Sequence, residues 1–271
     1  MTQELLSNPA VQGGVAPFVV ALLVALVLAR AQLAGLAVLA AFLTCTYFVA
    51  GFQLTPLTAL RKVLLVVVAA GLLAVLLDFA FRPTRVGFAL VAVGCAAASL
   101  WAFGPVIATR PGAEAWRLGA VVAVSVAFMV GFSMRVLASD GVRAGAAALG
   151  TGLGVGVAAI IGASASLGLQ GISLGAGAGA FLLPQMIRGK KAFAGATLTL
   201  PAMLIGALLA CAAMVLAELP WHAVLVLAAI PAVAALPLPR SAPAWAQAVL
   251  CTLYTLVVAG AACALAWPAS Q

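Results

Sequence analysis

Charged side chains are scarce in this chain of 271 residues: Asp, Glu, Lys and Arg together make up 7% of it, whereas 66% of its residues are hydrophobic. Soluble proteins contain roughly 25% charged and 45–50% apolar residues. No long hydrophilic interval separates the apolar runs, so we expect no soluble catalytic or ligand-binding domain. The composition predicts an all-α polytopic membrane protein, with residues 1–271 forming a single transmembrane domain.

Histidine and paired cysteines are also nearly missing. The chain has one His and five Cys, and no two cysteines have the CxxC spacing typical of zinc or redox sites. The cysteines fall inside apolar runs and are expected to be free, buried thiols: Cys45, Cys95, Cys211, Cys251 and Cys263. We therefore expect no bound metal and no cofactor.

Acidic residues number only five against thirteen Lys and Arg, which gives a formal net charge of +8. In a soluble protein this excess would indicate a nucleic-acid partner. Here the basic residues stand mostly at the ends of apolar runs, where they set membrane orientation. The expected partner is the lipid bilayer, with a second copy or other membrane subunits as further partners and no nucleic acid.

The longest uncharged run extends from Ala144 to Ile187. As one helix it would be roughly 66 Å long at ~1.5 Å per residue, about twice the ~30 Å hydrocarbon core of a bilayer. The run must therefore fold back on itself. Small and hydroxyl residues interrupt it between Gly162 and Gly171, where they can satisfy backbone groups freed by a break. We predict two tightly packed helices joined by a turn in this segment.

Proline, glycine and charged residues divide the remaining sequence into further apolar segments. About ten transmembrane helices are expected, approximately at residues 9–29, 32–52, 63–81, 86–108, 116–137, 142–163, 171–187, 193–217, 222–236 and 244–267. Residues 1–14 contain Glu4 and no Lys or Arg, unlike the start of a cleaved signal peptide, so we expect the first helix to be retained.

The basic residues favour one orientation of these helices. With the N-terminus outside, the inward connections hold Arg30, Arg82, Arg85, Arg135, Arg143, Arg188, Lys190, Lys191 and Arg240, and the outward ones hold only Arg61, Lys62, Arg110 and Arg117. This bias predicts a bacterial inner-membrane protein with both termini outside. Five helices in each half, 9–138 and 142–267, would orient the halves oppositely, so a 5+5 inverted repeat is a further hypothesis based on helix count alone.

Glycines at one-turn spacing suggest close helix packing in the uncharged run. Gly171, Gly175 and Gly179 form a GxxxGxxxG pattern, and the preceding predicted helix carries Gly150, Gly152, Gly154 and Gly156. Such faces allow the backbones of membrane helices to approach closely. The alternative is a substrate path lined by exposed backbone.

A substrate path is also suggested by polar residues and prolines in apolar surroundings. The hydrogen-bonding side chains nearest the expected break are Ser164, Ser166, Gln170 and Ser173. Polar groups at membrane depth often face a cavity, although serine can equally bond to its own helix. Pro184 and Pro201 each remove a backbone hydrogen bond and suit a discontinuous helix at a binding site, or a kink that serves packing only.

Among the acidic residues, Asp78 precedes Arg82 by four positions, the spacing of a salt bridge along one helix. We therefore expect a structural ion pair between these two side chains. Asp78 is also the remaining acidic candidate for the carboxylate that proton- or sodium-coupled carriers commonly use.

The function that this pattern favours is a transporter or permease of a small or amphipathic solute, with its path near residues 142–217. The alternative is a non-catalytic membrane subunit that binds partner helices through its glycine-rich faces. A remote alternative is an intramembrane serine hydrolase, since residues 162–166 resemble the serine motif of rhomboid proteases in a few positions and His222 follows. The glycine expected after the serine is missing, as is any histidine in the first half.

Overall fold

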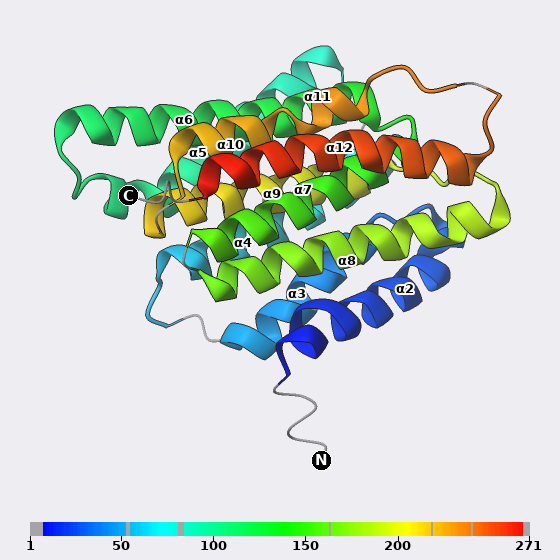
Figure 1. Cartoon of the computed structure of the whole chain (residues 1–271), viewed down its shortest axis with the longest axis horizontal. Coiled ribbons are helices and arrows are strands. Elements are labelled where there is room, and N and C mark those ends of the chain that lie inside the picture. The colour runs from blue at the N-terminus through cyan, green and yellow to red at the C-terminus, as the bar shows by residue number, and fades with distance from the viewer. Residues whose placement is uncertain are drawn as a thin grey trace.

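The computed structural model describes residues 8–52, 55–80, 84–162, 164–217, 219–239 and 241–267, and every regular element in these ranges is helical (Figure 1). The elements are η1 (Val11–Val15), α2 (Ala16–Leu28), η2 (Ala29–Ala31), α3 (Leu36–Ala50), α4 (Ala59–Phe79), α5 (Arg85–Ile107), α6 (Gly112–Phe132), η3 (Ser133–Leu137), α7 (Gly141–Ile161), α8 (Ala165–Arg188), α9 (Gly195–Leu216), α10 (Trp221–Ala228), α11 (Ile230–Ala234) and α12 (Ala244–Ala266). The all-α fold predicted from the sequence is confirmed for this part of the chain.

Within the described ranges, eight helical segments are long and apolar enough to cross a membrane. The predicted helices at 32–52 and 222–236 are shorter than expected. The first becomes the 15-residue α3, because Gln32 turns the chain with a φ of 58° before α3 begins. At ~1.5 Å per residue, such a helix is about 22 Å long, which is less than the ~30 Å apolar core of a bilayer. The second is divided into α10 and α11 at Ala229, two residues before Pro231.

The uncharged run folds back as predicted, but in a shorter turn. α7 ends at Ile161 and α8 begins at Ala165, so the expected start of the second helix at Gly171 is wrong. Leu167 and Gly168 are buried, and Gly168 lies against the Gly156 carbonyl of α7. Packing against α7 therefore favours helix from the first residues after the turn, despite the low helix propensity of serine and glycine.

The seven glycines singled out from the sequence lie in three different surroundings. A side chain on Gly152 or Gly171 would collide with the backbone of Gly175 or Gly156 across the α7–α8 contact. Gly150 and Gly154 instead approach Thr255 and Ala259 of α12. For Gly179, the nearest atom that a side chain would meet belongs to Phe18, at 3.9 Å, so this glycine is not in tight backbone contact.

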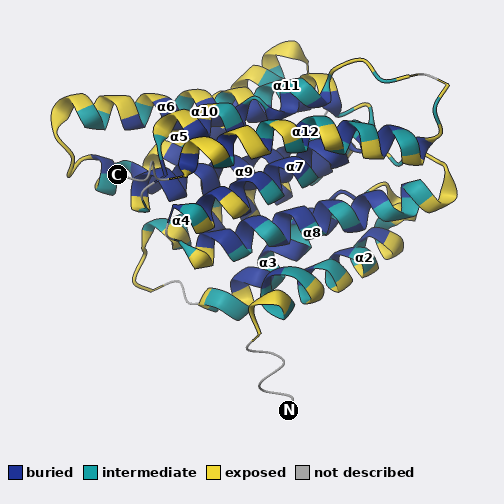
Figure 2. Cartoon of the chain, in the orientation of Figure 1, coloured by how far each residue is buried: buried dark blue, intermediate teal, exposed yellow. Residues whose placement is uncertain are grey.

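One helix, α9, is enclosed by the others. It is buried along its whole apolar window and contacts α3, α4, α5, α6, α7, α8 and α10, and Figure 2 shows it as buried ribbon at the centre of the bundle. α2, α4, α5 and α12 are more exposed and form parts of the periphery. In a membrane protein these outer faces are expected to contact lipid.

The turns gather at two ends of the bundle (Figure 1). Gly13 lies against Leu169 near the start of α8, and Cys263 lies 3.8 Å from the Gly154 carbonyl in the second half of α7. The first helix therefore begins, and the last helix ends, near the α7–α8 turn. At the opposite end, Lys191 contacts Asp140, and Arg143 contacts the Ala235 carbonyl. We call this opposite end the basic end, because most of the Lys and Arg residues that the structure describes lie there.

Candidate functional site at the basic end

The start of the enclosed helix is built around the carboxylate of Asp78. Asp78 lies near the end of α4, and its two oxygens accept hydrogen bonds from the backbone N–H groups of Ala196 and Thr197, both 2.8 Å long. The residue before α9, Ala194, offers no side-chain cap of its own. A carboxylate at this position satisfies two free N–H groups and complements the positive end of the helix dipole.

Gly195, the first residue of α9, makes this contact sterically feasible. Its φ of +56° belongs to the left-handed region, and its missing side chain leaves room for the Asp78 carboxylate. Its N–H donates to the Ala138 carbonyl at 3.1 Å, which ties α9 to the end of α6 and η3. The predicted partner of Asp78, Arg82, lies outside the described residues, and the ion pair with it stays a prediction.

A cavity of about 250 Å³ lies beside this contact, and we call it the α9 cavity. Its lining combines the Asp78 carboxylate and two hydroxyl residues with a mainly apolar wall: Asp78, Phe88, Met134, Ala138, Ser139, Phe193, Gly195, Ala196 and Thr199. Phe193 is 46% exposed and Ser139 is exposed, so the cavity lies close to the surface at the basic end. The arrangement can bind a small molecule that has both an apolar part and a group able to donate hydrogen bonds to a carboxylate.

The first turns of α9 lack one backbone hydrogen bond, close to the residues that line this cavity. Pro201 has no N–H to donate to the Thr197 carbonyl, so one bond of the helical ladder is missing there. The Thr199 hydroxyl donates to the Gly195 carbonyl at 2.7 Å, and the Thr197 hydroxyl donates to the Ala194 carbonyl at 3.3 Å. Pro201, proposed from the sequence as part of a path, thus lies in α9 one helical turn beyond the residues that meet Asp78.

A second set of polar contacts holds the connection between α8 and α9. Asp140 caps α7 and accepts from the Lys191 ammonium at 2.8 Å, with the Arg143 guanidinium 3.8 Å away. The buried Gln185 of α8 accepts from the Ala192 N–H at 2.9 Å and donates to the Phe181 carbonyl at 3.1 Å. These contacts fix the loop that leads into α9, and with it the position of Gly195.

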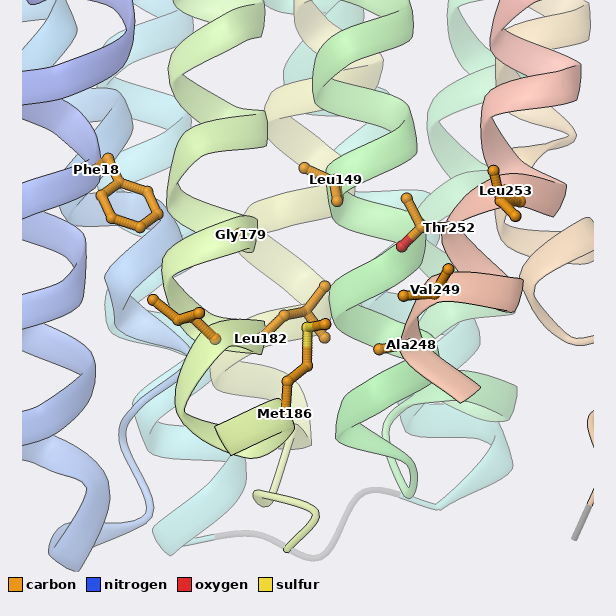
Figure 3. A pocket seen from close by; sticks show the side chains of 10 residues that line it. Phe18, Leu149, Gly179, Leu182, Met186, Ala248, Val249, Thr252 and Leu253 are labelled. Atoms are coloured by element: carbon orange, nitrogen blue, oxygen red, sulfur yellow. The ribbon is translucent and has the colours of Figure 1, made fainter. Parts of the chain in front are cut away.

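The other path residue from the sequence, Pro184, lines a different cavity, of about 220 Å³, on the α2 and α3 side of α8. This cavity has three cations at its edge, Arg188, Lys190 and Lys191, and is otherwise mainly apolar. A third cavity, of about 290 Å³, lies between α2, α7, α8 and α12 (Figure 3). Gly179 and Leu182 form part of its wall, and Thr252 contributes a hydroxyl group to an otherwise apolar lining.

The four polar residues predicted near the break do not form one group. Ser164 lies in the turn, whereas Ser166, Gln170 and Ser173 belong to α8, because that helix begins earlier than expected. Ser166 is exposed, and Ser173 is buried and donates to the Gln170 carbonyl at 2.7 Å. None of these four residues lines any of the three cavities described above.

The residues proposed for hydrolysis are not joined into a nucleophile–base pair. In the described part of the chain no hydrogen bond connects Ser166 with His222, and the rings of His222 and Trp221 are T-shaped with their centroids 5.7 Å apart. Nor do the described residues bring together three or more His, Cys, Asp or Glu side chains that could hold a metal ion.

Sequence reasoning identified Asp78 but not its partners. Neither Ser139 nor Thr199 was singled out from the sequence. One pattern in the sequence could have indicated this site. Gly195, Thr199 and Pro201 follow directly after the basic residues at positions 188–191.

Comparison with known proteins gives no further guide to this site. No protein-family model matches the chain, and searches of curated proteins and of solved structures also found no match.

Proposed function

We propose that the protein is a membrane transporter that takes up a small amphipathic solute through the α9 cavity at the basic end. The observation that carries the proposal is the position of Asp78, a carboxylate on the wall of a cavity at the start of the enclosed helix. Acidic side chains that face a cavity in a bundle of membrane helices commonly mark substrate or ion pathways.

The lining favours a solute with a cationic or hydrogen-bond-donating head. The Asp78 carboxylate offers remaining acceptor positions, and the Ser139 hydroxyl has no hydrogen-bond partner among the described residues. Phe88 and Phe193 add aromatic faces, which attract organic cations and also contact apolar groups. An organic ammonium compound with a small apolar body fits this combination.

The start of α9 also offers an element that can change between states. Its first turns lack one backbone bond at Pro201, and its N–H groups at Ala196 and Thr197 depend on a carboxylate from another helix. A solute that binds Asp78 competes with these N–H groups and so couples binding to the conformation of α9.

The orientation and symmetry expected from the sequence belong to the same proposal. The basic end would face the cytoplasm of a bacterial inner membrane, with both termini outside, and the two halves would be related as a 5+5 inverted repeat. Solute would then enter or leave at the cytoplasmic face.

A matched series of probes tests the proposal. Benzylamine, benzyl alcohol and benzoate share one ring but are positive, neutral and negative at pH 7. The full-length protein in proteoliposomes should take up benzylamine and, in mild detergent, should unfold at a higher temperature in its presence. Benzoate should produce neither effect.

Two variants test whether the Asp78 carboxylate is required for benzylamine uptake. Asp78→Asn should abolish benzylamine uptake, whereas Glu114→Gln should not change it, because Glu114 lies near the opposite end in a half-exposed pair with Arg110. If Asp78→Asn does not fold, Ser139→Ala should weaken uptake of the same probe. Equal uptake by all variants would overturn the proposal, and co-purification with stoichiometric partners without any probe effect would favour the membrane-subunit alternative.

A further inference from the structure

A fourth cavity lies on the outer surface, between α5 and α6. It has a volume of about 400 Å³ and is lined by apolar residues of both helices, with two arginines at one end: Arg85, Phe88, Ala89, Ala92, Val93, Ala127, Phe128, Gly131, Phe132 and Arg135. We call it the α5–α6 groove. It is separate from the α9 cavity, although Phe88 contributes to both.

The two arginines have no anionic partner in the described part of the chain. Arg85 is the first residue of α5 and Arg135 belongs to η3 at the end of α6, so the antiparallel helices bring both to the basic end of the groove. Both residues are exposed, and neither side chain makes a hydrogen bond or ion pair with a described residue. Two unpaired guanidinium groups at one end of a cavity can bind the same phosphate.

The rest of the groove suits a hydrocarbon chain. Its floor lies where Ala92 and Gly131 bring α5 and α6 close together, since a side chain on Gly131 would reach Ala92 at 3.1 Å. The rings of Phe128 and Phe132 stack at 5.5 Å along one wall. Val93 of the lining is 63% exposed, so the groove opens on the outer surface of the bundle, where lipid is expected.

We propose that the α5–α6 groove binds an anionic phospholipid, with the phosphate held by Arg85 and Arg135 and one acyl chain lying along Phe128 and Phe132. Charge complementarity carries the choice of occupant: the cations lie at the level of the lipid headgroups and the apolar lining lies at the level of the chains. Basic pockets between membrane helices bind anionic headgroups in this way. The inference does not depend on the proposed transport function.

Native mass spectrometry of the full-length protein, titrated in mild detergent with phosphatidylglycerol or phosphatidylcholine of identical acyl chains, tests this site. We expect phosphatidylglycerol to remain bound and phosphatidylcholine to dissociate. The double variant Arg85→Gln/Arg135→Gln should bind phosphatidylglycerol about thirty-fold more weakly, since each basic residue contributes about 1 kcal/mol to such binding and about 1.4 kcal/mol corresponds to a ten-fold change.

Two further variants separate the groove from general surface charge. Arg30→Gln removes an exposed cation in η2 that does not line the groove, and should leave lipid binding unchanged. Ala89→Phe keeps both arginines but fills the groove from its exposed side, and should weaken binding as the double variant does. If the double variant cannot be purified, lipid binding by Ala89→Phe alone tests the proposal.

The proposal is overturned if phosphatidylglycerol binds the double variant or Ala89→Phe as tightly as the unchanged protein. Equal weakening by Arg30→Gln would also overturn it, because binding would then follow net charge. Competition by inorganic phosphate at millimolar concentration would show an ion site without a chain-binding groove, which is a third contrary result.

Discussion

At the scale of single residues, the α7–α8 contact depends on glycines that face backbone. A methyl group on Gly171 would approach the Gly156 backbone nitrogen and Cα, each at 2.5 Å, and neither atom can rotate away. We predict that Gly171→Ala lowers the stability of the protein by about 1–3 kcal/mol, the usual range for overpacking. Thermal unfolding in mild detergent measures this effect.

Gly179→Ala is the matched control, because the same pattern in the sequence places Gly179 two turns further along α8. Its added methyl group would meet only Phe18 at 3.9 Å, an ordinary contact. We expect an unchanged or slightly higher unfolding temperature, since alanine favours helix over glycine. Equal destabilisation by the two substitutions would contradict the distinction between these glycines.

The cap that Asp78 provides for α9 should contribute to stability independently of transport. In Asp78→Ala, the N–H groups of Ala196 and Thr197 lose their side-chain acceptor at the start of an enclosed helix. Leaving buried donors without partners costs about 1–3 kcal/mol each. We predict a clear fall in unfolding temperature, whereas Glu114→Ala, at the half-exposed pair with Arg110, should have little effect. An unchanged unfolding temperature for Asp78→Ala would contradict the role of Asp78 as the cap of α9.

Asp78 shows what could and could not be predicted from the sequence at this scale. Its charge and its rarity drew attention to it, but its neighbours in the sequence suggested Arg82 as a partner. The described partners lie more than a hundred positions away, in the first turn of α9. A one-dimensional pattern predicts contacts along a helix and contains little information about contacts between distant helices.

At the scale of helices, most segments could be predicted because each apolar run must match the thickness of a bilayer. The reversal between Ile161 and Ala165 followed from the length of the uncharged run. The start of α8 at Ala165 could not be predicted in the same way. Ser166, Gly168 and Gln170 are typical of a loop, and the sequence does not show that they pack against α7.

The enclosed position of α9 could not be predicted from composition. α9 and α12 have the same mean hydropathy, yet α9 is buried throughout its apolar window and α12 is buried over only 28% of its own. Lipid chains and protein interior are both apolar, so hydropathy does not distinguish a central helix from a peripheral one.

Substitutions that enlarge side chains should distinguish the two helices. Ala207 of α9 has no exposed surface, so Ala207→Leu should destabilise the protein by about 1–3 kcal/mol. Gly260 of α12 has no heavy atom within 4 Å of an added side chain, so Gly260→Leu should be tolerated. Unfolding temperatures in detergent compare the two, and the reverse order would contradict the arrangement of the bundle.

At the scale of the whole molecule, the first helix begins and the last helix ends at the end opposite the basic end. If the basic end faces the cytoplasm, a cysteine at Gly112 should react with an impermeant maleimide added outside intact cells, in a variant without native cysteines. A cysteine at Lys190 should not react until the membrane is opened. Both positions are exposed, so a reversed labelling pattern would invert the proposed orientation.

The central claim, that a solute binds in the cavity at the start of α9, is tested most directly by a single cysteine in place of Ser139. We predict that a water-soluble maleimide labels this cysteine in the purified protein, and that benzylamine, but not benzoate, slows the labelling in a concentration-dependent manner. Labelling at the same rate with and without benzylamine, in protein shown to be folded, would contradict the account.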